Sequence, residues 1–336
     1  KQLEMYNSRI SGLGFYVPEN VVTNDDLSKV MDTNDEWIQE RTGIKERRHV
    51  LKDTETTTSM GVEAAKKAIE RAGIDKDDID FIVFATLSPD YYFPGPGVLV
   101  QRDLGLKRTV GALDVRNQCS GFVYGVSVAD QYIKTGMYKT ILVVGAEIQS
   151  SALDKSTEGR SSSVIFADGA GAAILQATEE DKGVLSTHLH ADGDYAEELY
   201  VRDPGSSRKV RLSKELLDGK SFNLTMNGNA VFKHAVVRFS EVINEALQQN
   251  GYTAEDIDLL VPHQANLRIS SFVQKQFNLP DEKVFNNIMT LGNTTAASIP
   301  IAMSEAWEQG KIKEGNLICL AAFGSGFTWA SALIRW

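Results

Sequence analysis

Cysteine is scarce in this chain, with only Cys119 and Cys319 among its 336 residues. Two cysteines do not make the disulfide framework of a small secreted protein, so we expect a reducing compartment. No apolar run reaches the roughly 18 to 20 residues that a membrane-spanning helix needs, and no signal-peptide pattern opens the chain. We therefore expect a cytoplasmic protein without a membrane partner, with Met5 as its natural start and residues 1–4 as an addition.

Positive charge is also in deficit, with 35 Lys and Arg against 45 Asp and Glu and a formal net charge of -10. This balance argues against nucleic acid as the main partner. The chain also lacks a stretch rich in Pro, Ser and Gly, which excludes a flexible linker between domains. With 42% hydrophobic and 24% charged residues, the composition is that of a soluble globular enzyme.

The chain contains an internal repeat. Residues 62–85 and 239–263 both show a helical pattern, a glycine, an acidic turn, Ile-Asp and an apolar run, at an offset of 178. Residues 129–145 and 304–320 form a second related pair, at an offset near 174. We infer two related halves, 1-178 and 179-336, which meet at the charged turn that follows residue 178.

Helical patterns alternate with apolar strand patterns in each half. This alternation predicts parallel sheets covered by helices. Two stacked halves of this kind predict an α/β fold with a five-layered α/β/α/β/α body.

Cys119 lies between an apolar run at 110–115 and a helical pattern at 122–134. The cysteine is therefore expected at a strand-to-helix turn, where backbone N–H groups and the helix dipole lower a thiol pKa from about 8.5 to about 3.5 to 7.5. Such a thiolate would be a nucleophile. The alternative is a small buried residue where helix meets sheet, because free cysteine is among the most buried residue types.

Two further polar residues occupy related positions. The offset of 174 relates Cys119 to Asn293, and His263 ends its apolar strand, at the edge where open α/β sheets place their sites. Alone, His263 is explained as a loop histidine and Asn293 as a helix cap. Together with Cys119 they predict a Cys/His/Asn catalytic site.

Trp37 and Arg41 stand four residues apart in a predicted short helix that ends at Gly43. Residues four apart share a helical face. A flat aromatic beside a guanidinium suits a nucleotide base, while surface packing with a salt bridge explains the same spacing.

Several motifs in order carry a resemblance to a known family. They are Asp35-Glu36-Trp37-Ile38, Arg41-Thr42-Gly43-Ile44, Cys119-Ser120-Gly121-Phe122, Asp168-Gly169-Ala170-Gly171-Ala172, Val261-Pro262-His263-Gln264-Ala265-Asn266, Gly292-Asn293-Thr294 and Phe323-Gly324-Ser325-Gly326-Phe327-Thr328-Trp329. From residue 10 to 336 the chain resembles the beta-ketoacyl-acyl carrier protein synthase III family, acyltransferases with the thiolase fold.

The resemblance implies the condensation that initiates fatty acid synthesis. Cys119 would take an acyl group from a coenzyme A thioester, and His263 and Asn293 would promote decarboxylation of malonyl-acyl carrier protein. The backbone N–H groups of Cys119 and Ser325 would form an oxyanion hole. The product would be a 3-oxoacyl-acyl carrier protein, and the resemblance implies no metal and no cofactor beyond the acyl-CoA substrate.

The resemblance also implies binding residues for both substrates. Trp37, Arg41 and Arg160 would hold the nucleotide end of coenzyme A, and Asn229 and Asn266 its pantetheine arm. Lys233, Arg268 and Lys275 would dock the acidic carrier protein, although a solvated surface explains these cations equally well. Phe93 would cross a homodimer interface to close the acyl pocket of the partner.

Four residues depart from the family pattern. Asn117 and Gln118 stand where small apolar residues are common, Leu291 where histidine is often found, and Ser325 where glycine is frequent. They leave open a paralogous condensing enzyme of a specialised acyl or polyketide pathway.

Other classes remain as alternatives. They are a non-catalytic acyl-binding subunit with the same fold, and a cysteine hydrolase. A thiolase fits less well because Cys319 lies in an apolar run and is interpreted as core, and an elongating synthase would use a second histidine where Asn293 stands.

Overall fold

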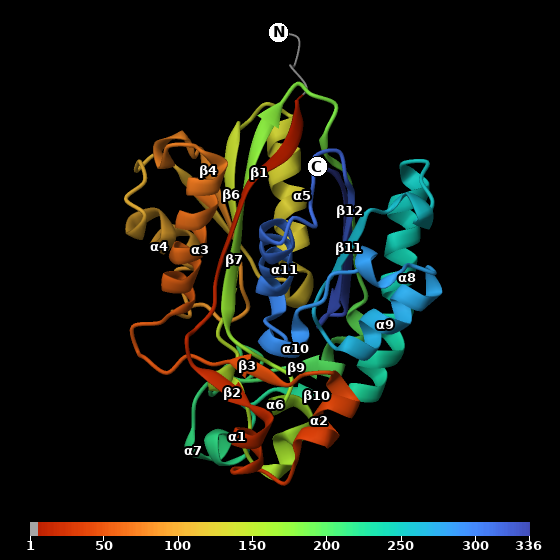
Figure 1. Ribbon diagram of the computed structural model, residues 1–336. Helices are drawn as coiled ribbons and strands as arrows, with labels where there is room; N and C mark the ends of the chain where they lie inside the picture. The colour runs from red at the N-terminus through yellow and green to blue at the C-terminus, as the bar shows by residue number, and fades with distance from the viewer. Residues whose placement is uncertain (1–5) are drawn as a thin grey trace.

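The computed structural model describes residues 6–336, and two sheets organise them (Figure 1). The first sheet has the order β1-β7-β6-β4-β5. Its strands are β1 (Asn7–Tyr16), β4 (Phe81–Ala85), β5 (Gly111–Val115), β6 (Thr140–Glu147) and β7 (Gly169–Thr178). The proposed start at Met5 lies outside the described residues.

The second sheet repeats the arrangement of the first, with the order β11-β12-β13-β8. Its strands are β8 (Gly183–Ala191), β11 (Leu259–Pro262), β12 (Leu317–Gly324) and β13 (Thr328–Arg335). Where β5 flanks β4 in the first sheet, a parallel bridge from Leu260 to Val284 flanks β11 in the second. The prediction of two duplicated halves is confirmed. The division at residue 178, between the end of β7 and the start of β8, stays a prediction.

The prediction of parallel sheets is correct for only part of each sheet. β4 pairs in parallel with β5 and β6, and β11 with β12, but β1, β7, β8 and β13 are antiparallel to their neighbours. A parallel pair needs a long crossover, usually a helix that covers the sheet. The connections from β6 to β7 and from β12 to β13 contain no such helix, so the chain returns antiparallel.

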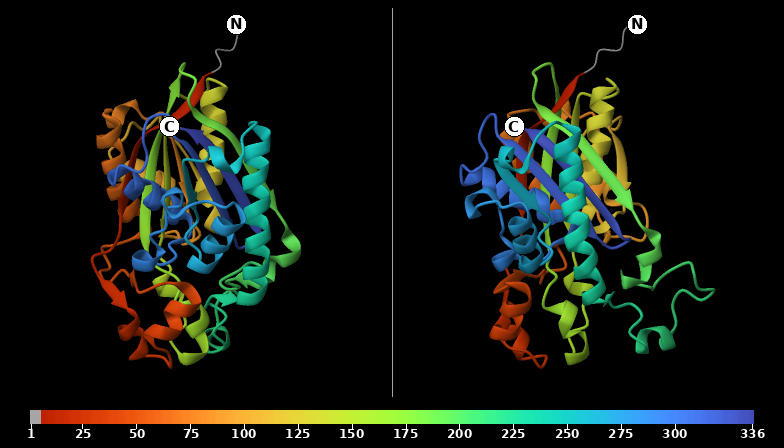
Figure 2. Two further views of the ribbon diagram at one scale, coloured as in Figure 1. Left: turned by 45° about the vertical axis from the view of Figure 1, so that its right-hand side comes forward. Right: turned by 90° about the vertical axis from the view of Figure 1, so that its right-hand side faces the viewer.

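Helices complete five layers (Figures 1 and 2). Two helices lie between the sheets, namely α5 (Gly121–Lys134) and α11 (Ser298–Glu308). The outer faces are covered by α3 (Thr57–Ala72) and α4 (Pro96–Asp103) on one side, and by α8 (Gly228–Gln249) and α9 (Leu267–Gln276) on the other. The predicted α/β/α/β/α body is therefore confirmed.

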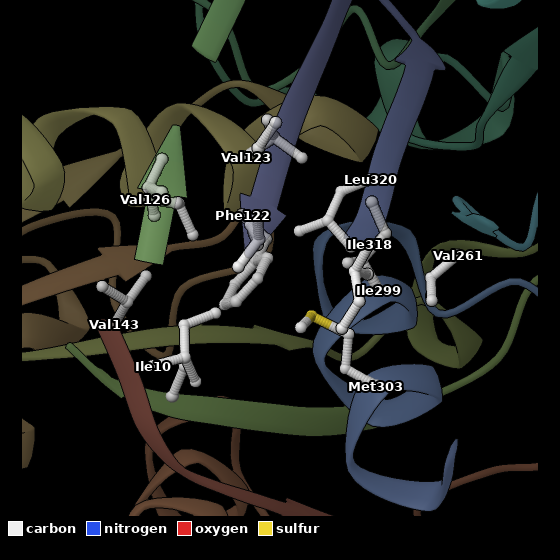
Figure 3. Packing of buried hydrophobic residues seen from close by; sticks show 14 of the residues in the cluster. Ile10, Phe122, Val123, Val126, Val143, Val261, Ile299, Met303, Ile318 and Leu320 are labelled. Atoms are coloured by element: carbon white, nitrogen blue, oxygen red, sulfur yellow. The ribbon is translucent and has the colours of Figure 1, made fainter. Parts of the chain in front are cut away.

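The two halves share one hydrophobic core (Figure 3). Phe122 and Val126 of α5 are buried in the same cluster as Ile299 and Met303 of α11 and Leu320 of β12. Because this cluster draws on both halves, the sheets and the central helices are held as one packed unit.

Shorter elements cap one end of the sheets (Figure 1). The helices are α1 (Asn24–Ser28), α2 (Asp35–Thr42), α6 (Arg160–Ser163), α7 (Lys214–Asp218) and α10 (Ile288–Leu291). Two two-stranded sheets lie beside them, one formed by β2 (Val21–Thr23) and β3 (Glu46–Arg48) and the other by β9 (Leu199–Tyr200) and β10 (Thr225–Met226). The helix predicted around Trp37 is α2, which Gly43 ends at a φ of 75°. Within residues 6–336, no helix has the length and apolar character needed to cross a membrane.

Two short 3-10 turns precede the central helices and contact each other, η2 (Gln118–Ser120) before α5 and η8 (Thr295–Ala297) before α11. Each turn opens on a residue in the left-handed region, Gln118 at a φ of 45° and Thr295 at 52°. These residues are 177 apart, the offset that also relates β6 to β12. The structural counterpart of Cys119 is therefore Ala296, and the expected equivalence with Asn293 is wrong by three residues.

One glycine shows how closely the layers approach. A Cβ at Gly171 of β7 would lie 2.7 Å from the Ile301 backbone nitrogen of α11. Contacts this short force the backbone to move, which typically costs about 1 to 3 kcal/mol. We expect Gly171→Ala to lower the free energy of unfolding by at least about 1 kcal/mol in urea denaturation.

Gly193→Ala is the matched control, because a Cβ there meets no atom within 4 Å. Its effect should stay within about 0.5 kcal/mol. Equal stability of the two variants would contradict the close packing of β7 on α11.

Candidate active site

Cys119 lies in η2, buried at the junction of the two halves. Gly324, at the end of β12, is the neighbour that permits this position. A Cβ at Gly324 would lie 2.6 Å from the Cys119 Sγ, well inside the van der Waals distance. The sulfur therefore occupies space that any other residue at 324 would fill.

Two backbone donors face the sulfur. The N–H groups of Ser325 and of Cys119 itself interact with the thiol and favour its thiolate form. The side chain of Ser325 is engaged elsewhere, since its Oγ donates to the Leu199 carbonyl. The departure from glycine at position 325 therefore leaves the backbone donor in place.

The pKa of Cys119 differs from the expectation. Burial and the Glu147 carboxylate raise the pKa of the thiol to about 12, although the two backbone N–H groups lower it. The expected fall in pKa at a helix start is therefore wrong, because desolvation penalises the thiolate more than these donors favour it. Glu147, at the end of β6, is itself buried, which raises its pKa to about 7 despite hydrogen bonds from Ser88, Leu87 and Thr86.

His263 follows β11 and is buried. Its Nδ1 lies 2.6 Å from the Ser298 Oγ at the start of α11. Its Nε2 is buried and has no hydrogen-bond partner among the described residues. Burial lowers the pKa of the imidazole to about 3, so His263 is neutral at pH 7.

Asn293 is held by its backbone and by its own side chain. Its N–H donates to the Ile165 carbonyl at 2.9 Å, and its carbonyl accepts from Ala167 at 2.8 Å. Its Oδ1 accepts from the Thr295 N–H at 2.8 Å. Because the amide oxygen is occupied, the side-chain NH2 group is left as a donor.

Cys119, His263 and Asn293 all line one cavity of about 370 Å³, which we call the entry cavity. It extends to Trp37 and Arg41 of α2. Its other polar lining residues are Thr42, Ser161, Asn229, Asn266 and Arg268. The structure thus brings together the three residues that the sequence predicted as one site.

A second cavity of about 490 Å³, which we call the inner cavity, also reaches Cys119. Apolar side chains such as Leu87 and Phe166 share its wall with Arg116, Gln118 and Gln149. Neither Arg116 nor Gln149 was predicted. Gln149 lies far from Cys119 in the sequence, and only the pairing of the β-strands brings it near.

Of the other departures, Asn117 does not line either cavity. Leu291 is buried in an apolar cluster with Ala297 and Ile301, away from both cavities. Cys319 is buried in β12, as its interpretation as core requires.

The aromatic and cationic residues of the predicted nucleotide site lie together. The guanidinium of Arg41 lies 4.4 Å from the centre of the Trp37 ring, and that of Arg160 lies 5.2 Å from it. Arg160 also donates to the Asp32 carbonyl at 2.5 Å. Asn266 caps α9 and donates to the Arg41 carbonyl at 3.0 Å, which ties α9 to α2.

The predicted docking cations lie on α8 and α9, and all three are exposed. Arg268 lines the entry cavity and lies 5.3 Å from the Phe232 ring centre, whereas Lys233 and Lys275 are outside the lining. Phe93 is 80% exposed and lines neither cavity of its own chain. Residues 6–336 hold no cluster of three His, Cys, Asp or Glu side chains suited to a metal ion.

The electrostatics of the thiol give a test. Glu147→Gln removes the carboxylate that raises the Cys119 pKa, so the thiolate fraction should increase. We expect alkylation of Cys119 by iodoacetamide to become faster by up to about ten-fold near pH 8. Near pH 5.5 the difference should vanish, because Glu147, with a pKa of about 7, is then protonated in the wild type.

Cys119→Ser is the control for this labelling, because Cys319 is buried. Slower alkylation in Glu147→Gln, or an increase that does not depend on pH, would contradict the assigned effect of the carboxylate.

Family models match two parts of the chain. Residues 113–193 match 3-oxoacyl-[acyl-carrier-protein (ACP)] synthase III, and residues 247–336 match the C-terminal part of the same family. The beta-ketoacyl-[acyl-carrier-protein] synthase III of Xanthomonas campestris pv. campestris is 48% identical, and the match covers 98% of each chain.

Solved structures agree with these matches. The 3-oxoacyl-[acyl-carrier-protein] synthase III of Aquifex aeolicus VF5 is 42% identical with a TM-score of 0.90, over 98% of this chain and 100% of that one. The priming beta-ketosynthase of the R1128 polyketide biosynthetic pathway is 31% identical with a TM-score of 0.90, and the match covers 100% of this chain and 98% of that one. From these matches and the shared five-layered architecture, we conclude that the chain belongs to the 3-oxoacyl-[acyl-carrier-protein] synthase III family.

Proposed function

We propose that this protein condenses an acyl-CoA primer with malonyl-acyl carrier protein, with loss of carbon dioxide, to give a 3-oxoacyl-acyl carrier protein. This is the condensation that initiates fatty acid synthesis. The observation that carries the proposal is the convergence of Cys119, His263 and Asn293 on the entry cavity, in a chain of this family.

The first step transfers the primer to the enzyme. The Cys119 sulfur attacks the thioester carbonyl, the bond from that carbonyl to the coenzyme A sulfur breaks, and the thiol proton leaves with coenzyme A as its free thiol. The oxyanion of the tetrahedral intermediate is stabilised by the N–H groups of Cys119 and Ser325, which already face the sulfur.

The second step makes the carbon–carbon bond. Malonyl-acyl carrier protein loses carbon dioxide, and the electron pair moves onto the thioester oxygen as an enolate. The Nε2 of His263 and the side-chain NH2 of Asn293 donate to that oxygen. The enolate carbon then attacks the acyl carbonyl, and Cys119 leaves as the thiolate. Each donor of this kind stabilises the transition state by about 3 to 4 kcal/mol.

The entry cavity suits coenzyme A. It runs from Trp37 and Arg41 to Cys119, and Arg160 lies beside Trp37. Trp37, Arg41 and Arg160 would hold the adenine nucleotide, while Asn229 and Asn266 would bind the amides of the pantetheine arm.

The carrier protein delivers the malonyl group to the same cavity. Lys233, Arg268 and Lys275 are exposed on α8 and α9, the helices that carry Asn229 and Asn266, and supply positive charge on a protein whose net charge is -10. An acidic carrier needs this local complementarity for rapid association. We further propose a cytoplasmic homodimer in which the exposed Phe93 closes the inner cavity of the partner, and a reaction without metal or cofactor.

The inner cavity, which also reaches Cys119, would hold the acyl chain. Gln118 and Gln149 make part of its wall polar, which favours a second candidate, a synthase of the same family that primes a specialised acyl pathway.

The two half-reactions separate the proposed roles. With radiolabelled acetyl-CoA, Cys119→Ser should retain no thioester label. His263→Ala should label Cys119 normally but condense with malonyl-acyl carrier protein about 100-fold more slowly or worse, because one enolate donor is lost. Condensation by His263→Ala at the wild-type rate would overturn this assignment. Release of free acetate without malonyl substrate would indicate a hydrolase instead.

Primer choice tests the inner cavity. The inner cavity of a single chain, about 490 Å³ before a partner closes it, exceeds what an acetyl group needs, so acyl-CoA primers longer than acetyl should be accepted. Gln149→Leu should raise kcat/KM for saturated primers relative to hydroxylated ones by about ten-fold, since a polar partner in the wall is replaced by methyl groups.

Gln248→Leu, on the exposed side of α8, is the control and should leave the ratio of the two kcat/KM values unchanged. An unchanged ratio in Gln149→Leu as well would show that Gln149 does not contact the primer.

A further inference from the structure

We propose that Ser298 is a positioning residue that fixes the tautomer of His263, with the hydrogen on Nε2. The inference rests on the proposed function, in which His263 donates from Nε2 to the enolate. It concerns a residue outside the Cys/His/Asn set and a hydrogen that decides whether His263 acts as a donor or an acceptor.

The hydrogen-bond partners of Ser298 determine the direction of its hydroxyl. The Ser298 Oγ lies 2.6 Å from His263 Nδ1 and accepts from the Gln264 N–H at 3.3 Å. A hydroxyl has one hydrogen to donate and two lone pairs that accept. The Gln264 N–H takes one lone pair, so the remaining question is whether the Ser298 hydrogen or a His263 hydrogen lies between Oγ and Nδ1.

The count of donors answers this question. Ser298 is buried, and His263 Nδ1 is the only acceptor available to its hydroxyl hydrogen among the described residues. If His263 donated from Nδ1, the Ser298 hydrogen would be buried without a partner, which is costly. The hydroxyl therefore donates to Nδ1, and the single hydrogen of the neutral imidazole resides on Nε2.

The Nε2 atom then has a clear role. It is buried, has no partner among the described residues, and belongs to a side chain that lines the entry cavity with Cys119 and Asn293. The Thr295 N–H constrains Asn293 in the same way, by occupying Oδ1 so that the NH2 group remains. Two contacts from η8 and the start of α11 thus turn a donor of each side chain, the His263 Nε2–H and the Asn293 NH2, toward the enolate oxygen.

A purely structural role explains Ser298 less well. Its hydroxyl makes no hydrogen bond to the backbone of its own helix, and the cap of α11 has no side-chain hydrogen bond. At the same offset of 177 the first half has Gly121, which begins α5 without any hydroxyl. A helix start at this place does not require serine, so the hydroxyl serves the two groups that it contacts, His263 Nδ1 and the Gln264 N–H.

The tautomer itself is measurable on the whole protein. The chain has five histidines, and with ¹⁵N-labelled histidine the signal of His263 is identified by its loss in His263→Asn. We expect the wild type to show hydrogen on Nε2 and a bare Nδ1, and Ser298→Ala to show a mixture of tautomers. Hydrogen on Nδ1 in the wild type would overturn the proposal.

Kinetics give the second readout. In Ser298→Ala, acetyl transfer to Cys119 should stay within about two-fold of the wild type, whereas kcat for decarboxylation of malonyl-acyl carrier protein should fall about ten- to hundred-fold with KM unchanged. Ser298→Thr keeps the hydroxyl and should recover most of the rate. Equal losses in both half-reactions, or no loss of kcat, would contradict the positioning role.

Ser304→Ala is the matched control, a buried serine of the same helix whose Oγ accepts from Arg71 at 2.9 Å. It should change stability and leave both half-reactions intact. His263→Ala separates this proposal from the proposed function. If that variant still decarboxylates the malonyl substrate normally, the function of His263 is wrong, whichever tautomer the spectrum shows.

Discussion

The contact between η2 and η8 at the centre of the molecule is the constraint on which the site depends. These two turns begin α5 and α11, the helices that lie between the sheets and contribute side chains to the same hydrophobic cluster. Gly324 of β12 and Gly145 of β6 allow these strands to approach η2 and η8 without a side chain between them. Because the halves share one core, Cys119 from the first and His263 and Asn293 from the second are held in one cavity without a hinge.

Burial also sets the charge of the site. It raises the pKa of Cys119 and lowers that of His263, which favours a neutral thiol and a neutral imidazole over an ion pair. A neutral imidazole with a fixed hydrogen is a good donor to a forming enolate and does not lose that function by titration near pH 7. Burial disfavours the thiolate form of Cys119. Activation of this thiol therefore depends on the backbone N–H donors that face the sulfur and on the thioester that binds beside it.

The repeat in the sequence predicted the layers, and it brought Asn293 to the site of Cys119 and His263 although the expected equivalence of Cys119 and Asn293 was wrong by three residues. The repeat did not predict features that depend on local geometry in the folded protein. Antiparallel pairing of β7 depends on what connects the strands, and the raised pKa of Cys119 depends on burial and on Glu147, which the fold brings close. Gln149 and Ser298 have no sequence signal beyond their residue type, because their roles come from the atoms they face after folding.

The duplication explains why the same strained turn occurs twice with different chemistry. Gln118 and Thr295 both adopt the left-handed region, which is sparsely populated for residues other than glycine and persists only where the surroundings enforce it. In the first half this turn places Cys119 so that its own N–H faces its sulfur. In the second half the corresponding residue is Ala296, and it is the N–H of Thr295 that acts, by holding Asn293. One backbone shape thus positions a nucleophile in one half and orients a hydrogen-bond donor in the other.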